Sequence, residues 1–79
     1  MNPINVGLLG IGTVGGGTFT VLARNAAEIT RRAGRPFRIT QVADKNLELA
    51  RSVVGDQAKV TDDAFAVVSD PTIDIVIEL

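Results

Sequence analysis

Three glycines near the N-terminus have the spacing of a phosphate-binding loop. The run Gly10-Ile11-Gly12-Thr13-Val14-Gly15 matches the pattern G-x-G-x-x-G. In such a loop the first glycine permits a tight turn, the second lets the backbone approach a pyrophosphate, and the third allows a helix to pack closely on a strand. The free N–H groups of Gly12, Thr13 and Val14 would face the phosphates at the positive end of the helix dipole. The pattern predicts dinucleotide binding, and the alternative is a glycine-rich turn that only packs a helix.

Asp44 and Lys45 form a second candidate site. An acid after the second strand of a dinucleotide-binding unit accepts hydrogen bonds from the adenosine ribose, which favours NAD over NADP. That acid usually lies about 20 residues beyond the loop, and Asp44 lies farther from Gly15 than that. Lys45 would instead suit a 2′-phosphate, so both NAD and NADP remain candidate cofactors. Alternatively, Asp44 only begins the next helix.

The other carboxylates do not define a reaction. Asp62, Asp63, Asp70 and Asp74 fall where a helix start, a turn and a strand start are expected, so we predict capping and solvation for them. Glu78 has no visible catalytic partner. The chain also lacks histidine and cysteine, the commonest ligands of transition metals and common acid–base or nucleophilic groups. We therefore assign no catalytic residue and no metal site to these residues.

The hydrophobic pattern predicts the elements that position these groups. Four apolar runs read as strands, at Ile4–Leu9, Phe37–Ala43, Ala58–Val60 and Ile73–Leu79. Three helices alternate with them, over Thr13–Arg32, from the cap Asn46 to Val54, and from the capping Thr61 to Ser69.

Two of these elements carry specific expectations about their faces. The first helix is expected to pack one face on the sheet, formed by Val14, Val21, Leu22, Ala26 and Ile29. The second strand is expected to alternate strictly, with Phe37, Ile39, Gln41 and Ala43 on one face and Arg38, Thr40 and Val42 on the other.

The alternation of strands and helices predicts an α/β fold with right-handed crossovers. We expect a Rossmann-like, doubly wound parallel sheet of about four strands in the order 3-2-1-4, with ligands bound beyond the strands' C-terminal ends. Gly10 should meet Glu78 and Leu79 there. Because the sequence stops within the fourth strand, residues 1–79 are expected to be the N-terminal part of a dinucleotide-binding domain, without a substrate or catalytic domain. Alone, the chain should be inactive and should self-associate through its open strand edge.

Composition excludes several other classes. Eight Lys and Arg residues balance nine Asp and Glu residues, so net charge attracts neither nucleic acid nor anionic lipid. No stretch resembles a signal peptide or a membrane span. We therefore expect a cytoplasmic protein with a small-molecule ligand.

Three segments together resemble the N-terminal part of homoserine dehydrogenase. They are Asn5-Val6-Gly7-Leu8-Leu9-Gly10-Ile11-Gly12-Thr13-Val14-Gly15-Gly16-Gly17, Val42-Ala43-Asp44-Lys45-Asn46 and Asp74-Ile75-Val76-Ile77-Glu78-Leu79. The similarity runs through the whole chain. The Gly-Thr-Val-Gly form of the loop and the terminal Val-Ile-Glu-Leu are more specific than the three-glycine pattern alone.

The resemblance implies an NAD(P)-dependent oxidoreductase that interconverts aspartate semialdehyde and homoserine in threonine, methionine and isoleucine biosynthesis. It places Gly12, Thr13 and Val14 at the cofactor phosphates, Asp44 and Lys45 near the adenosine ribose, and Leu79 on the nicotinamide side. The substrate would bind through a domain absent from these residues, and the full-length protein is expected to form a homo-oligomer.

Two other families share part of the pattern. Enzymes like glucose-fructose oxidoreductase have the same loop and a similar Asp-Pro-x-Ile-Asp-Ile-Val strand, but usually continue toward an apolar residue and proline. Non-catalytic nucleotide-sensing modules, such as those of potassium-transport regulators, also combine the loop with a ribose-binding acid.

Overall fold

The computed structural model describes residues 3–11 and 16–79. Along the chain the elements are β1 (Ile4–Leu9), α2 (Gly16–Ala33), β2 (Phe37–Ala43), α3 (Leu47–Val54), β3 (Lys59–Thr61), α4 (Ala64–Val68) and β4 (Ile75–Glu78). The strands form one sheet in the order β3-β2-β1-β4, and every pairing between them is parallel. The predicted strand order and the Rossmann-like class are confirmed.

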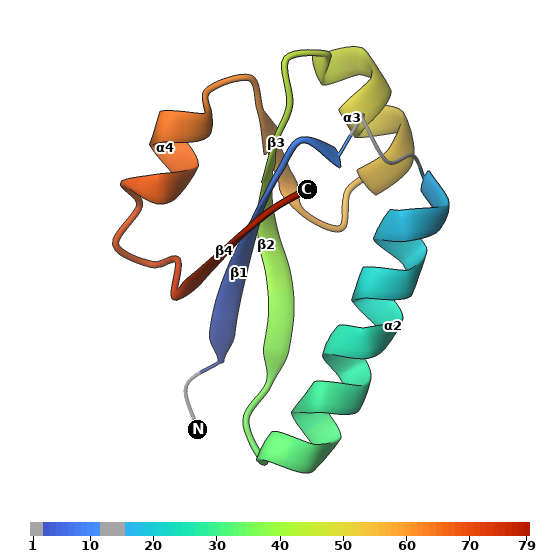
Figure 1. Ribbon diagram of the computed structural model, residues 1–79, viewed down its shortest axis with the longest axis vertical. Helices are drawn as coiled ribbons and strands as arrows, with labels where there is room; N and C mark the ends of the chain where they lie inside the picture. Colours follow the sequence, from blue (N-terminus) through green and yellow to red (C-terminus); the bar gives the residue numbers. More distant parts are fainter. Residues whose placement is uncertain (1–2, 12–15) are drawn as a thin grey trace.

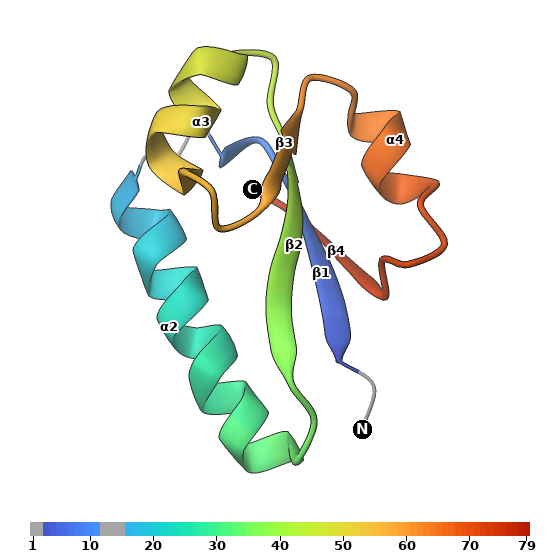
Figure 2. The same ribbon diagram turned by 180° about the vertical axis from the view of Figure 1, so that it is seen from behind.

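Helices cover both faces of this sheet. Figures 1 and 2 show α2 and α3 on one face and α4 on the other. The main core lies under α2 and α3, where Val6 and Leu8 of β1 and Val42 of β2 are fully buried beside Phe19, Ala50 and Val54. Burying a side chain of this size stabilises the fold by about 1.5–3 kcal/mol. β1 also has a neighbouring strand on each side, so it is the centre of the domain.

The face of α2 that meets the sheet differs from the predicted one. Phe19 and Ala26 are buried and Leu22 packs against the core, whereas Val21 and Ile29 remain 50% and 42% exposed. The expectation that Val21 packs on the sheet is therefore wrong, and Val14 lies outside the described residues. Ile29 nevertheless lies over the sheet, where it lines a small cavity together with Val6, Leu8 and Ile39.

A bulge in β2 overturns its expected alternation. Val6 pairs with Ile39 but Gly7 pairs with Gln41, so Thr40 is an extra residue in β2. Ile39 and Val42 consequently share the α2 face, because their partners Val6 and Leu8 are two residues apart on β1. Within the described part of the chain, the buried hydroxyl of Thr40 has no hydrogen-bond partner.

The third helix has a different cap from the one expected. Thr61 is the last residue of β3, and Asp63 caps α4 by accepting hydrogen bonds from Phe65 N and Ala66 N. The prediction that Thr61 caps this helix is wrong, because its backbone pairs with β2 through Ala43. Its hydroxyl instead accepts a hydrogen bond from Asp63 N at 3.1 Å.

The two remaining strands are displaced or shorter than predicted. β3 is shifted by one residue, since its pairing with β2 runs from Lys59 to Thr61. β4 begins at Ile75 rather than Ile73, because Ile73 N donates to Asp70 O and so belongs to the turn before the strand. In the described part of the chain β4 pairs with β1 alone.

The turn before β4 is tied to the sheet by side chains. Asp70 accepts hydrogen bonds from Gln41 Nε2 on one oxygen and from the N–H and hydroxyl of Thr72 on the other. Asp74 accepts one from Asn5 N at 2.7 Å. With the cap at Asp63, these contacts confirm structural roles for three of the four aspartates singled out from the sequence.

We predict that Gly7→Ala destabilises the protein. An added Cβ would overlap Cγ1 of Val67, which is fully buried in α4, and overpacking of this kind costs about 1–3 kcal/mol. Chemical denaturation measures the effect. The matched control is Gly17→Ala in α2, where a Cβ meets nothing within 4 Å and helix propensity should stabilise by about 0.5–1 kcal/mol. Equal changes in the free energy of unfolding for the two substitutions would show that Gly7 and Val67 are not tightly packed.

We predict that Asp70 makes stability depend on acid pH. Hydrogen bonds from the Thr72 hydroxyl, then from the Thr72 N–H and from Gln41, hold the pKa of Asp70 below its ordinary value. A carboxyl whose pKa is lowered by folding contributes fully above its unfolded pKa, and the contribution is lost as pH falls through the folded pKa. Between about pH 5 and pH 2 the free energy of unfolding should fall less steeply in Asp70→Asn than in the wild type. An unchanged slope would contradict this prediction, and Asp56→Asn serves as the control.

Candidate functional site

The chain turns sharply where β1 ends. Gly10 has φ of 84°, a backbone conformation that glycine adopts without strain, and a Cβ there would lie 3.4 Å from Leu79 O. Its N–H donates to Ala43 O at 2.9 Å. The next residue, Ile11, is fully buried in the main core, so it anchors the start of the glycine-rich loop. Ile11, the apolar residue between the first two glycines, was not among the residues predicted from the sequence to bind the cofactor.

The other predicted phosphate-binding residues, Gly12, Thr13, Val14 and Gly15, lie outside the described residues. The structure describes both sides of that loop, the turn at Gly10 and the start of α2 at Gly16. The helix has 18 residues and no acidic residue in its first turn. The positive end of its dipole is therefore not neutralised by a carboxylate of its own first turn, as an anion-binding helix terminus requires.

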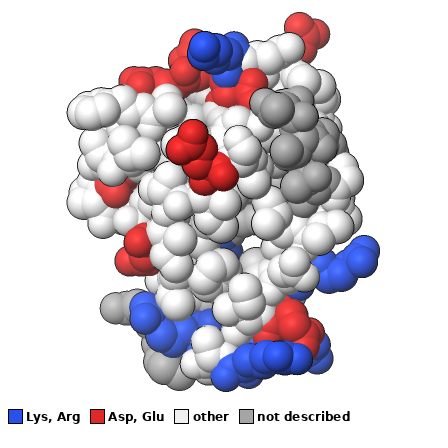
Figure 3. Space-filling model, viewed as in Figure 1, with Lys and Arg blue, Asp and Glu red and all other residues white. Residues whose placement is uncertain are grey.

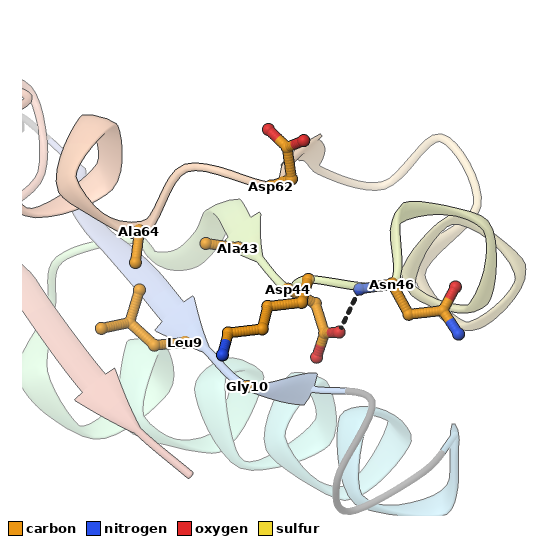
Figure 4. Close-up of a pocket in the computed structure, with 8 residues that line it drawn as sticks. Leu9, Gly10, Ala43, Asp44, Asn46, Asp62 and Ala64 are labelled. Carbon is orange, nitrogen blue, oxygen red and sulfur yellow. Dashed lines mark hydrogen bonds between the residues drawn. The ribbon is translucent and has the colours of Figure 1, made fainter.

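A hollow of about 490 Å³ opens beside Gly10 at the C-terminal edge of the sheet. The ends of β1 and β2 and the segment between β3 and α4 surround it, as Figure 4 shows. It is lined by Leu9, Gly10, Ala43, Asp44, Lys45, Asn46, Asp62 and Ala64. Small apolar side chains with a few polar groups at the rim are typical of a nucleotide pocket. Gly10, Asp44 and Lys45, three of the residues predicted to bind the cofactor, thus line one hollow.

Hydrogen bonds orient Asp44 at this hollow. Its backbone N–H continues the ladder to Thr61 O at 2.9 Å. Its carboxylate Oδ1 accepts a hydrogen bond from Asn46 N at 2.8 Å, drawn as a dashed line in Figure 4. Asn46 in turn caps α3 by accepting from Leu49 N at 3.0 Å. Asp44 therefore helps to form the turn into α3, and this turn orients its carboxylate.

Leu79 reaches the same edge from the other side of β1. Its N–H donates to Leu9 O at 3.0 Å, and Glu78 pairs with Leu9. The predicted convergence of Gly10 with Glu78 and Leu79 is confirmed. Because β1 separates β2 from β4, Leu79 and Asp44 lie on opposite sides of the turn at Gly10, as the two ends of a dinucleotide bound across this edge would require.

Asp62 and Ala64 are site residues that sequence reasoning missed. Both line the hollow, although they are far from the glycine loop in sequence. The predicted strand order could have identified these two residues, because the ends of neighbouring parallel strands meet at one edge of the sheet.

The fold and this edge define a dinucleotide-binding α/β domain of the Rossmann-like class. A family model described as "Homoserine dehydrogenase, NAD binding domain" matches residues 10–79. The chain belongs to this family.

Similar proteins extend this result over the whole chain. A homoserine dehydrogenase of Methylobacillus glycogenes is 76% identical over all 79 residues, and this match covers 19% of that protein. One of Pseudomonas aeruginosa is 48% identical over the whole chain and 18% of its own length. The crystal structure of a homoserine dehydrogenase from Thiobacillus denitrificans superposes with a TM-score of 0.79 at 59% identity, covering 96% of this chain and 17% of that one. The chain thus spans about a fifth of the length of these relatives.

These matches favour the homoserine dehydrogenase resemblance over the two other families considered from the sequence. Among the described residues, no helix is long and apolar enough to cross a membrane.

We predict that Asp44→Ala lowers affinity for NAD by about tenfold or more, because charge-assisted hydrogen bonds are worth about 1.5–3 kcal/mol. Affinity for NADP should be nearly unchanged or improved, since the carboxylate repels a 2′-phosphate. Calorimetric titration of the full-length protein with both cofactors measures this.

Two variants separate the carboxylate from the turn that it forms. Asp44→Asn keeps an oxygen for the hydrogen bond from Asn46 N, so it should retain the turn and lose only the charge. Asp56→Ala, at an exposed position outside the hollow, should change neither affinity. Equal losses for NAD and NADP in Asp44→Ala would show that Asp44 is purely structural.

Proposed function

We propose that this chain is the cofactor-binding part of an NAD(P)-dependent homoserine dehydrogenase, which interconverts aspartate semialdehyde and homoserine. The observation that supports the proposal most directly is the hollow at the C-terminal edge, bounded by Gly10 and Asp44, in a chain that belongs to the NAD-binding family of this enzyme. When bound, the nicotinamide dinucleotide accepts or supplies the hydride of the reaction.

The residues of the chain bind and orient that cofactor in this proposal. The N–H groups of Gly12, Thr13 and Val14 hold the pyrophosphate, and Gly15 completes this loop. Asp44 accepts hydrogen bonds from the adenosine ribose, with Lys45 beside it. Leu79 contacts the nicotinamide side.

The fit of a dinucleotide to this edge rests on the described residues. Any residue with a side chain at position 10 would be strained, because φ is positive there and a Cβ would lie 3.4 Å from Leu79 O. Asp44 and Lys45 line the hollow, and α2 begins at Gly16, directly after the glycine loop. These features supply an anion-binding helix start, a turn and an acceptor for ribose hydroxyls in the order that a dinucleotide presents them.

The substrate would bind in a further domain of the full-length protein, which the relatives' greater length accommodates. The proposal includes a homo-oligomeric enzyme acting in the cytoplasm in the synthesis of threonine, methionine and isoleucine. It also includes the expectation that residues 1–79 alone do not catalyse hydride transfer.

The experiment that tests the proposal is the substitution Gly12→Val in the full-length protein. A branched side chain at the second glycine would occupy the path of the pyrophosphate, so we expect loss of cofactor binding by calorimetry and loss of homoserine-dependent NAD(P) reduction. Gly12→Ala should give a smaller loss, because its side chain is smaller.

Circular dichroism and thermal melting of the variants provide the control for folding. A folded Gly12→Val protein with unchanged affinity for both cofactors would refute the phosphate-binding role. A wild-type protein that binds the cofactor but does not oxidise homoserine would refute the proposed reaction while leaving the cofactor site intact.

A further inference from the structure

Two adjacent aspartates follow β3, and they have different surroundings. Asp63 Oδ1 accepts hydrogen bonds from Phe65 N at 3.0 Å and Ala66 N at 3.3 Å, so this carboxylate is engaged as the cap of α4. Asp62 is exposed and lines the hollow. Within the described residues, no hydrogen bond or ion pair involves the Asp62 side chain. Capping therefore explains Asp63 and leaves Asp62 unexplained.

The register of the sheet brings Asp62 next to Asp44. The last pair joining β2 and β3 is Ala43 with Thr61, and Asp44 N donates to Thr61 O at 2.9 Å. Asp44 and Asp62 occupy the next position on each chain, where neighbouring strands are about 4.8 Å apart. Figure 4 shows their carboxyl groups turned away from each other, as like charges favour. Both residues thus line the same hollow from adjacent chain segments.

The charged residues that line the hollow sum to a negative value. They are Asp44, Asp62 and Lys45, two negative charges and one positive, which gives −1. Figure 3 shows a cluster of Lys and Arg at the opposite end of the molecule, where α2 ends and β2 begins with Arg31, Arg32, Arg35 and Arg38, while Arg24, Arg51 and Lys59 lie on α2, α3 and β3. Lys45 can offset one carboxylate, so the second one sets the sign of the potential.

We propose that Asp62 is a specificity-determining residue of the cofactor site, which disfavours a 2′-phosphate on the adenosine ribose and so selects NAD over NADP. The inference rests on the proposed function, because it concerns the ribose end of the same site. A phosphate monoester adds about 1.5–2 negative charges near neutral pH. A ribose with free hydroxyls adds none and can donate hydrogen bonds to a carboxylate. The charge of Asp62 therefore lowers the affinity for NADP and leaves the affinity for NAD nearly unchanged.

The test compares Asp62→Asn with Asp63→Asn in the full-length protein, by calorimetric titration with NAD and with NADP. Each substitution removes one negative charge, and the two positions are neighbours. Asn is also a good helix N-cap, so Asp63→Asn keeps the cap of α4. The two variants thus differ in one respect. Asp62→Asn removes a charge that lines the hollow, whereas Asp63→Asn removes a charge that does not.

We expect Asp62→Asn to raise affinity for NADP about three- to fivefold, the effect of a charge interaction of about 1 kcal/mol near a protein surface. Affinity for NAD should change less than twofold, and Asp63→Asn should change the ratio of the two affinities less than twofold. At 1 M salt the Debye length is about 3 Å, so the gain in Asp62→Asn should largely vanish. Asp62→Lys should increase the gain at low salt.

Three outcomes would overturn the inference. They are an unchanged ratio of NAD to NADP affinity in both Asp62 variants, equal changes in the ratio for Asp62→Asn and Asp63→Asn, and a gain that persists at high salt. A wild-type protein that binds neither dinucleotide would instead refute the proposed function itself, so the two failures are distinguishable.

Discussion

The central position of β1 constrains the rest of the domain. This strand pairs with β2 on one side and β4 on the other, and its Val6 and Leu8 are fully buried. On the opposite face the lack of a side chain at Gly7 lets Val67 of α4 come close. β1 ends at Leu9, and Gly10, with φ of 84°, provides the turn that follows it.

The position of that turn brings the candidate site together. Gly10 N bonds to the end of β2, and Leu79 N bonds to the end of β1, so residues from both halves of the chain meet within one strand width of the glycine loop. The hydrogen bond from Asn46 N to Asp44 then fixes a carboxylate beside the turn. The site is therefore built mainly from backbone geometry at strand ends, which suits a ligand that is held by its phosphates and ribose hydroxyls.

The bulge at Thr40 shows how tertiary packing corrects a local pattern. It places Gln41 opposite Gly7, on the face where Gln41 Nε2 donates to Asp70. Val42 then joins Ile39 in the core on the other face. The cost is a buried hydroxyl at Thr40 without a partner among the described residues. The bulge thus brings Val42 into the core and ties the turn before β4 to the sheet.

The sequence by itself determined the features that depend on local chemistry. The bounds of β1 and β2, the cap at Asn46 and the strand order followed from apolar runs, capping side chains and the right-handed crossover rule. Tertiary structure alone decided the buried face of α2, the bulge in β2, the cap at Asp63 and the proximity of Asp62 to Asp44. Those features depend on how ring volume and strand register are matched between segments far apart in the chain, and periodicity within one segment contains no information about its partner's register.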